Sequence, residues 1–149
     1  MREESRFQAD VISSAGAVGL LQLMPQLGKR IARNLKEKPV SRVDLTDADL
    51  NVRYGTFHLK ELINQVRGWD VPPEFVMPLV VASYNAGSSP VKRWVNEIGT
   101  DRLDVFVESI PYSETRAYVK RVLQSAQIYY LLYAEKVKRM ATKEGETKL

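Results

Sequence analysis

Apolar residues recur at helical spacing along nearly the whole chain, and no stretch alternates with the two-residue period of a β-strand. Clusters of Pro, Gly and Ser separate the apolar stretches and indicate short connections between them. The pattern predicts helices over residues 25–36, 47–67, 74–86, 90–98 and 101–108, followed by one long helix after Ser113. We therefore predict a single all-α domain that occupies residues 1–149.

Two local features belong to the predicted helix over residues 47–67. Thr46 and Asp49 resemble a capping box, which would start the helix directly after Thr46. Gly55 lies on the apolar face of the same helix. A glycine there indicates either the close approach of another helix or a tolerated defect, and the sequence leaves both interpretations open.

The last helix carries one continuous apolar stripe, which runs from Val119 to Val137. The residues that follow are mostly charged and contain a glycine. Because chain ends of this composition have little to pack against, we expect residues 138–149 to form a frayed tail.

The composition is that of a soluble globular protein, with 44% hydrophobic and 27% charged residues among 149. No apolar run approaches the roughly 18 residues of a membrane-spanning helix, and the charged N-terminus lacks the apolar core of a secretory signal. Cysteine is absent and His58 is the only histidine. These counts exclude disulfides and cysteine metal sites, and they disfavour a Ser-His-Asp triad. Acid–base chemistry would therefore depend mostly on carboxylates.

Glu4 has neighbours that could make it a general acid. If the segment MREESRF is the end of a helix packed on the core, Phe7 and the glycines that follow would bury Glu4. Burial raises the pKa of a carboxyl group toward neutrality, as a general acid requires. For Glu4 taken alone, a solvated chain end is the simpler interpretation, and Glu3 keeps that interpretation.

Other polar residues each have a structural explanation when they are taken singly. Glu114 suits the first turn of the last helix, where the helix dipole favours a carboxylate. Tyr84 and Asn85, in ASYNAG, would end a buried helix before a glycine. Gln22 and Met24, which have apolar neighbours, fit core and helix-start positions. For His58, in the middle of a predicted helix, a hydrogen-bonded surface or boundary position is a simpler explanation than a catalytic role.

Five blocks of the sequence nevertheless stand in a recognisable order. They are ESRF, SSAGAVGLLQLMP, NVRYGTFHLKEL, ASYNAG and IPYSETRAYV, and the region extends over roughly Glu3 to Tyr130. In this order they resemble the soluble lytic transglycosylase family, glycoside hydrolase family 23, which belongs to the same broad group as goose-type lysozyme. The resemblance implies an all-α lysozyme-like domain with a groove for the glycan strands of peptidoglycan.

The resemblance also implies roles for individual residues. The glutamate of the E-S motif, which is Glu4 here, would be the single catalytic acid and base. The groove residues that would contact the sugars are Ser13, Gln22, Met24, Tyr84, Asn85, Glu114 and Tyr118. Glu114 and Tyr118 are four residues apart, so both would lie on one face of the last helix.

The implied reaction cleaves the β-1,4 bond between N-acetylmuramic acid and N-acetylglucosamine and leaves a 1,6-anhydro end. The substrate would replace a second carboxylate, because its acetamido oxygen can support the developing cation and its own 6-hydroxyl can attack. No metal, nucleotide or other cofactor is implied. The implied location is the bacterial cell envelope, most simply the periplasm.

This chain also departs from the family pattern. Only three residues precede Glu4, so we expect the helix that carries it to be truncated, through a fragment or a mis-set start codon. Two alternatives remain: a lysozyme that uses water on the same bond, and an inactive module that binds glycan. A nucleic-acid binder rests only on the net charge of +4, and the Lys and Arg residues are scattered among acids.

Overall fold

The computed structural model describes the backbone of residues 1–146 and the side chains of residues 1–134. Within these residues the regular structure is helical, and two isolated β-bridges occur in the loop before α2. The elements in order are α1 (Arg2–Ser5), α2 (Pro25–Asn34), the 3-10 helix η1 (Asp44–Thr46), α3 (Ala48–Arg67), α4 (Pro73–Ala86), α5 (Ser88–Ile98), α6 (Leu103–Glu108) and α7 (Ser113–Glu146). The predicted all-α fold is confirmed, and the five internal helices lie within two residues of their predicted bounds.

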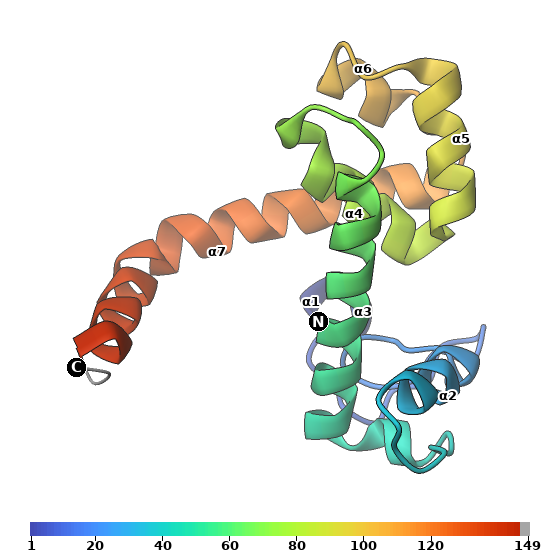
Figure 1. Ribbon diagram of the computed structural model, residues 1–149, viewed down its shortest axis with the longest axis vertical. Helices are drawn as coiled ribbons and strands as arrows, with labels where there is room; N and C mark the ends of the chain where they lie inside the picture. The colour runs from blue at the N-terminus through green and yellow to red at the C-terminus, as the bar shows by residue number, and fades with distance from the viewer. Residues whose placement is uncertain (147–149) are drawn as a thin grey trace.

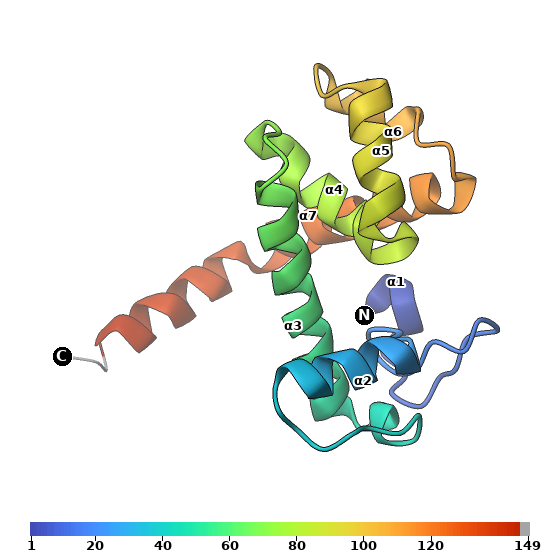
Figure 2. The ribbon, with the colours of Figure 1, turned by 45° about the vertical axis from the view of Figure 1, so that its right-hand side comes forward.

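Two apolar clusters form the interior, and α3 runs through both of them (Figure 1). One cluster joins the second half of α3 to α4, α5, α6 and the first part of α7. The other joins the first half of α3 to α2, η1 and the loop over residues 18–23. Tyr84, near the end of α4, packs against both clusters. Figure 2 shows α1 in the space between α2 and α5, close to this junction.

The first turn of α3 is capped by Asp47. Its carboxylate accepts a hydrogen bond from the N–H of Leu50 at 2.8 Å, which satisfies one of the free donors at the start of the helix. The Thr46 hydroxyl instead donates to the carbonyl of Val43, the residue that precedes η1. The predicted capping box was therefore wrong by one residue, because Thr46 ends a separate 3-10 turn and its side chain is used there.

Gly55, in the middle of α3, permits the close approach of the loop that precedes α2. A Cβ atom at this position would lie 2.2 Å from Cδ1 of Leu21 and 3.0 Å from its Cβ. The first of the two interpretations of this glycine is thus confirmed in part. The approach is close, but the partner is a loop side chain instead of a second helix.

Asn51 is a fully buried polar residue that fixes the same loop to α3. Its Oδ1 accepts a hydrogen bond from the N–H of Leu21 at 2.8 Å. Its Nδ2 donates to the carbonyls of Val18 at 2.9 Å and Leu45 at 2.8 Å. These bonds satisfy a buried amide and hold residues 18–21 in place beside the site.

The first part of α7 packs against the other helices, and the remainder of α7 projects away from them (Figure 1). Val119 is fully buried and Leu123 is partly buried against the larger cluster. By contrast, the apolar side chains at positions 128–133 are all exposed, Leu131 to 73%. The second half of the predicted stripe is thus apolar but exposed, and of these residues Tyr129 lines a cavity together with Arg2 and Glu3.

The backbone of α7 is helical as far as Glu146, which includes part of the segment over residues 138–149 that the sequence predicts to be a frayed tail. Lys, Met, Ala and Glu are strong helix formers and account for this continuation. The side chain of Val137 and residues 147–149 lie outside what the structure describes. Within the described part of the chain, no helix is long and apolar enough to cross a membrane.

Candidate active site

Glu4 is carried by α1, a helix of a single turn. Directly after it, Arg6 and Phe7 have φ angles of 51° and 65°, a left-handed backbone that ends the helix. Ser5 is buried, and its hydroxyl donates to the carbonyl of Leu20 at 3.0 Å. These constraints hold α1 against the loop, and they leave the Glu4 side chain on the wall of a cavity.

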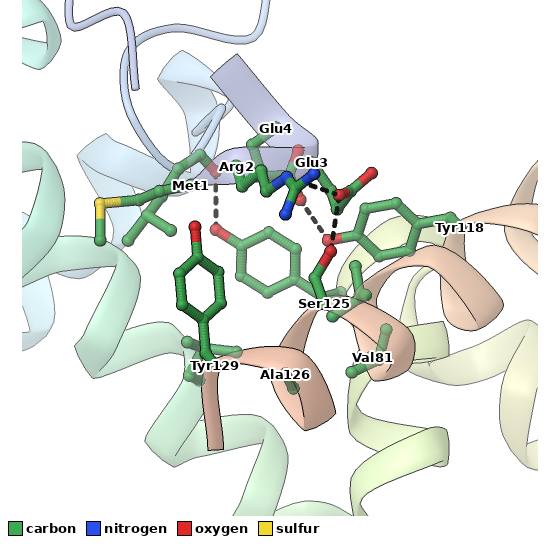
Figure 3. A pocket seen from close by; sticks show the side chains of 13 residues that line it. Met1, Arg2, Glu3, Glu4, Val81, Tyr118, Ser125, Ala126 and Tyr129 are labelled. Carbon is green, nitrogen blue, oxygen red and sulfur yellow. Dashed lines mark hydrogen bonds and ion pairs between the residues drawn. The ribbon is translucent and has the colours of Figure 1, made fainter. Parts of the chain in front are cut away.

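The cavity has a volume of about 250 Å³ and lies between α1 and the facing sides of α3, α4 and α7 (Figure 3). Three of the residues implied by the family resemblance line it together, namely Glu4, Tyr84 and Tyr118. Much of the remaining wall is apolar and includes Leu21, Leu59, Val81, Val122 and Ala126. A carboxyl group on such a wall is partly withdrawn from water, which is the setting that favours its protonated form.

Tyr118 hydrogen-bonds directly to the Glu4 carboxyl. Its phenol reaches across from α7 and donates to Oε1 of Glu4 (Figure 3). Burial has the largest effect on the pKa of Glu4 and raises it above its ordinary value. The Tyr118 hydrogen bond and the Met1 amino group lower this pKa, and the negative charge of Glu3 raises it. The net direction is upward, so Glu4 retains a proton to higher pH than an ordinary glutamate, as a general acid must.

Tyr84 lies between the cavity and the loop that precedes α2. Its hydroxyl donates to the carbonyl of Leu21 at 2.7 Å. Burial, followed by the nearby charge of Glu4, raises the pKa of Tyr84, so this phenol stays neutral and remains a donor. On its other side, the ring centroid lies 5.5 Å from that of His58, which is partly buried and faces Glu61. The prediction of a boundary histidine is confirmed.

Three other residues implied by the resemblance belong to the loop before α2 and its junction with that helix. The Ser13 hydroxyl accepts a hydrogen bond from a backbone N–H four residues further on and closes a turn. Gln22 has a φ of 46°, and its side-chain amide donates to the carbonyl of Gly19 at 2.9 Å. Met24 is exposed and precedes α2. None of the three lines the cavity beside Glu4, and their roles toward sugars stay predictions.

Asn85 and Glu114 lie near the junction of α4 and α7. Asn85 is exposed, and its Oδ1 accepts a hydrogen bond from the buried hydroxyl of Thr115 at 2.6 Å. Glu114 is exposed in the first turn of α7. Neither side chain lines the cavity, whereas Tyr118, one turn further along α7, does. The structure thus groups Tyr118 with Glu4 and leaves the roles of Asn85 and Glu114 toward sugars as predictions.

Sequence reasoning missed a second polar cluster beside Glu4. Glu3 was expected to be solvated, but its Oε1 accepts a hydrogen bond from the Ser125 hydroxyl at 2.8 Å (Figure 3). Its Oε2 lies 3.4 Å from Nε of Arg121. The available signal was the spacing along the last helix, since residues 118, 121 and 125 share one face. Among the side chains described, no group of three or more His, Cys, Asp or Glu residues could hold a metal ion.

Comparison with known proteins places this geometry in context. A family model described as the transglycosylase SLT domain matches residues 1–105, and one described as the soluble lytic transglycosylase helical domain matches residues 109–137. The soluble lytic murein transglycosylase of Escherichia coli K12 is 33% identical over 145 residues, which are 96% of this chain and 21% of that protein. The chain therefore spans about a fifth of the length of this curated relative.

Two solved structures extend the likeness to three dimensions. The 70 kDa soluble lytic transglycosylase of E. coli matches with a TM-score of 0.77 and 34% identity, over 88% of this chain and 20% of that one. An inactive glutamate-to-glutamine mutant of the lytic transglycosylase Slt from Pseudomonas aeruginosa matches with a TM-score of 0.74 and 35% identity, over 89% and 20%. The fold is thus an all-α, lysozyme-like helical domain. By the match over residues 1–105, the chain belongs to the transglycosylase SLT domain family.

Proposed function

We propose that this chain is a peptidoglycan lytic transglycosylase in which Glu4 is the single acid and base. The observation that carries the proposal is the Glu4 carboxyl, which lines an apolar cavity, has a raised pKa and accepts a hydrogen bond from Tyr118. A carboxyl group in this state can donate a proton to a glycosidic oxygen at a pH where an exposed glutamate is already ionised.

The proposed reaction begins with protonation of the oxygen that joins N-acetylmuramic acid to N-acetylglucosamine. As this bond breaks, the acetamido group of the muramic acid supports the positive charge that develops at the anomeric carbon. The Glu4 carboxylate then accepts the proton of the 6-hydroxyl while that oxygen attacks the anomeric carbon. The products are a chain with a 1,6-anhydro end and a free N-acetylglucosamine end, and Glu4 regains its proton.

The other carboxylate on the cavity wall is less suited to this role. Glu3 lines the same cavity, but Ser125 and Arg121 engage both of its oxygens. These contacts hold the Glu3 carboxylate toward α7, whereas the Glu4 carboxyl lies against the apolar cavity wall. The mechanism therefore assigns the proton transfers to Glu4 alone.

The relatives support the substrate class. The E. coli relative is named for action on murein, and the solved P. aeruginosa relative is inactive when a glutamate is replaced by glutamine. By extension we propose peptidoglycan glycan strands as the substrate and the cell envelope, specifically the periplasm, as the place of action. Sugar contacts are proposed for Ser13, Gln22, Met24, Tyr84, Asn85, Glu114 and Tyr118.

Mass spectrometry of the products formed from purified sacculi tests this function. A lytic transglycosylase releases muropeptides with anhydro ends, which are lighter by one water than the products of hydrolysis. We expect anhydro products from the wild-type chain at every time point. Hydrated products alone would instead assign the chain to the lysozymes, and binding without release would make it a glycan-binding module.

A further inference from the structure

Glu3 links the helix that carries Glu4 to the long helix α7. Its side chain is 20% exposed, although the sequence suggests a solvated position. The Ser125 hydroxyl donates to one carboxylate oxygen at 2.8 Å, and Arg121 lies 3.4 Å from the other. Arg2, its neighbour on α1, approaches to 3.9 Å. The carboxylate is therefore held from the α7 side by two different side chains.

Contacts on two sides orient α1, the element that carries Glu4. On the loop side, Ser5 fixes α1 to the carbonyl of Leu20. On the α7 side, the side-chain contacts of α1 come from Glu3 and from the Tyr118 hydrogen bond to Glu4 itself.

We propose that Glu3 is a positioning residue for Glu4, held by Arg121 and Ser125 of α7 so that α1 keeps the Glu4 carboxyl on the cavity wall. The inference rests on the proposed function, in which Glu4 transfers the proton. Glu3 itself does not touch the substrate in this account. It acts through its neighbour, both by fixing the backbone of α1 and by placing one negative charge beside Glu4.

The charges around Glu4 make the role testable. At the start of the chain the titratable or charged groups are the Met1 amino group, Arg2 and Glu3, and on α7 they are Tyr118, Arg121 and Tyr129. On α4, Tyr84 faces the same carboxyl. Glu3 raises the pKa of Glu4 through its charge. Arg121 partly offsets that charge as long as the pair is formed.

Two substitutions break the same ion pair and have opposite electrostatic consequences. Glu3→Gln removes the negative charge and leaves Arg121 in place, so the pKa of Glu4 should fall. Arg121→Ala leaves the negative charge of Glu3 without its partner, so the pKa of Glu4 should rise. The shifts should be on the order of half a unit, the scale of one unit charge that acts across several ångströms of a water-like dielectric. The larger shift should belong to Glu3→Gln, because the charge of Glu3 acts on Glu4 directly. A purely mechanical link predicts the same direction for both variants.

The experiment measures the Glu4 carboxyl directly by 13C NMR titration of the full chain, with Glu4→Gln used to assign the signal. The pH profile of kcat/KM on glycan strands is recorded in parallel. The pH at which activity falls on its alkaline side should be lower for Glu3→Gln and higher for Arg121→Ala. Arg121→Lys keeps the positive charge, so the alkaline side of its pH profile should coincide with that of the wild type. Ser125→Ala should lower kcat at least about threefold with little movement of the alkaline side, because it removes a contact and no charge.

Matched controls come from the neighbouring ion pair between Glu108 of α6 and Lys120 of α7. Glu108→Gln on α6 and Lys120→Ala, at the position of α7 next to Arg121, make the same changes of charge and should leave the titration of Glu4 unchanged. Shifts in one common direction for Glu3→Gln and Arg121→Ala, or shifts no larger than those of the controls, overturn the proposal. Because the NMR titration does not depend on activity, it tests Glu3 even if Glu4 proves not to be the acid.

Discussion

The phenol of Tyr118 donates a hydrogen bond to the carboxyl of Glu4 across 114 positions of sequence. The family resemblance assigned Tyr118 to sugar binding, and the structure adds a contact to the proposed acid. The bond stabilises the ionised form of Glu4 and opposes the effect of burial on its pKa. Through Tyr118, the long helix α7 thus influences the pKa of Glu4.

Replacement of Tyr118 by Phe removes this hydrogen bond and keeps the ring. The pKa of Glu4 should rise, because the interaction that lowers it is lost. We expect the alkaline limb of the pH profile to move to higher pH. We also expect kcat/KM at the optimum to fall about tenfold, the equivalent of a hydrogen bond worth about 1.4 kcal/mol. Tyr133→Phe, on the exposed part of α7, is the control, and a limb that moves to lower pH would contradict the assignment.

The raised pKa of Glu4 also predicts how stability depends on pH. Its value in the unfolded chain is near 4.5, and its value in the folded chain is higher. The stabilisation from protonated Glu4 is complete below the unfolded value and is lost as pH rises through the folded value. Glu4→Gln removes this ionisation, so the variant should melt at a higher temperature than the wild type at about pH 8.

Thermal unfolding of both proteins across a pH series checks this prediction. The difference in melting temperature should disappear below about pH 4, where Glu4 is protonated in both states of the wild-type chain. Each kcal/mol corresponds to roughly 2–4 °C in a domain of this size. Glu97→Gln, at an exposed position of α5, should give no such pattern. A gain in melting temperature that is equal at all pH values would point to a cause other than ionisation.

Gly55→Ala sets two effects of opposite sign against each other. Helix propensity favours Ala by about 0.8–1.0 kcal/mol. The added Cβ would meet Leu21 at 2.2 Å and 3.0 Å, so the whole Leu21 side chain must move, and overpacking of this kind costs about 1–3 kcal/mol. We expect net destabilisation in urea unfolding, whereas Gly68→Ala, at the end of the same helix, should change stability little. A more stable Gly55→Ala variant would show that the loop adjusts without cost.

Asn51→Ala should destabilise the chain by at least about 2 kcal/mol, because the N–H of Leu21 and the carbonyl of Leu45 lose the partner that Asn51 provides. The carbonyl of Val18 loses one of its two donors and keeps the N–H of Leu23. Chemical denaturation measures the loss. The exposed Asn64, on the same helix, provides the matched Ala variant and should cost less than about 0.5 kcal/mol. Equal effects at the two positions would argue against the role of Asn51 in holding the loop.

The helical framework was largely predictable because its signals are local. Apolar spacing and Pro or Gly punctuation located α2 to α6 closely, and the order of the sequence blocks indicated the family. The same reasoning failed for the second half of α7, since periodicity shows an apolar face but not whether anything covers it. Residues 128–133 carry that face and are exposed, although Tyr129 lines the cavity beside α1.

The candidate site was predictable only in part, because its decisive contacts are long-range. Glu4 was chosen through the family resemblance, and its burial depends on residues more than 70 positions away, such as Tyr84 and Tyr118. Glu3 was expected to be solvated because its partners, Ser125 and Arg121, lie more than 110 positions away in the sequence. Asn51 went unnoticed because a polar residue in a helix is ordinarily exposed, and its three partners all come from other segments.

The most direct test of the central claim is the release of anhydro-muropeptides by Glu4→Gln, measured by mass spectrometry on purified sacculi beside the wild-type chain. Gln keeps the size of the side chain and removes its proton chemistry, so the fold and the binding of glycan strands should persist. We predict that the variant binds strands with near wild-type affinity and releases no anhydro product above background. Release at the wild-type rate would show that another group supplies the proton.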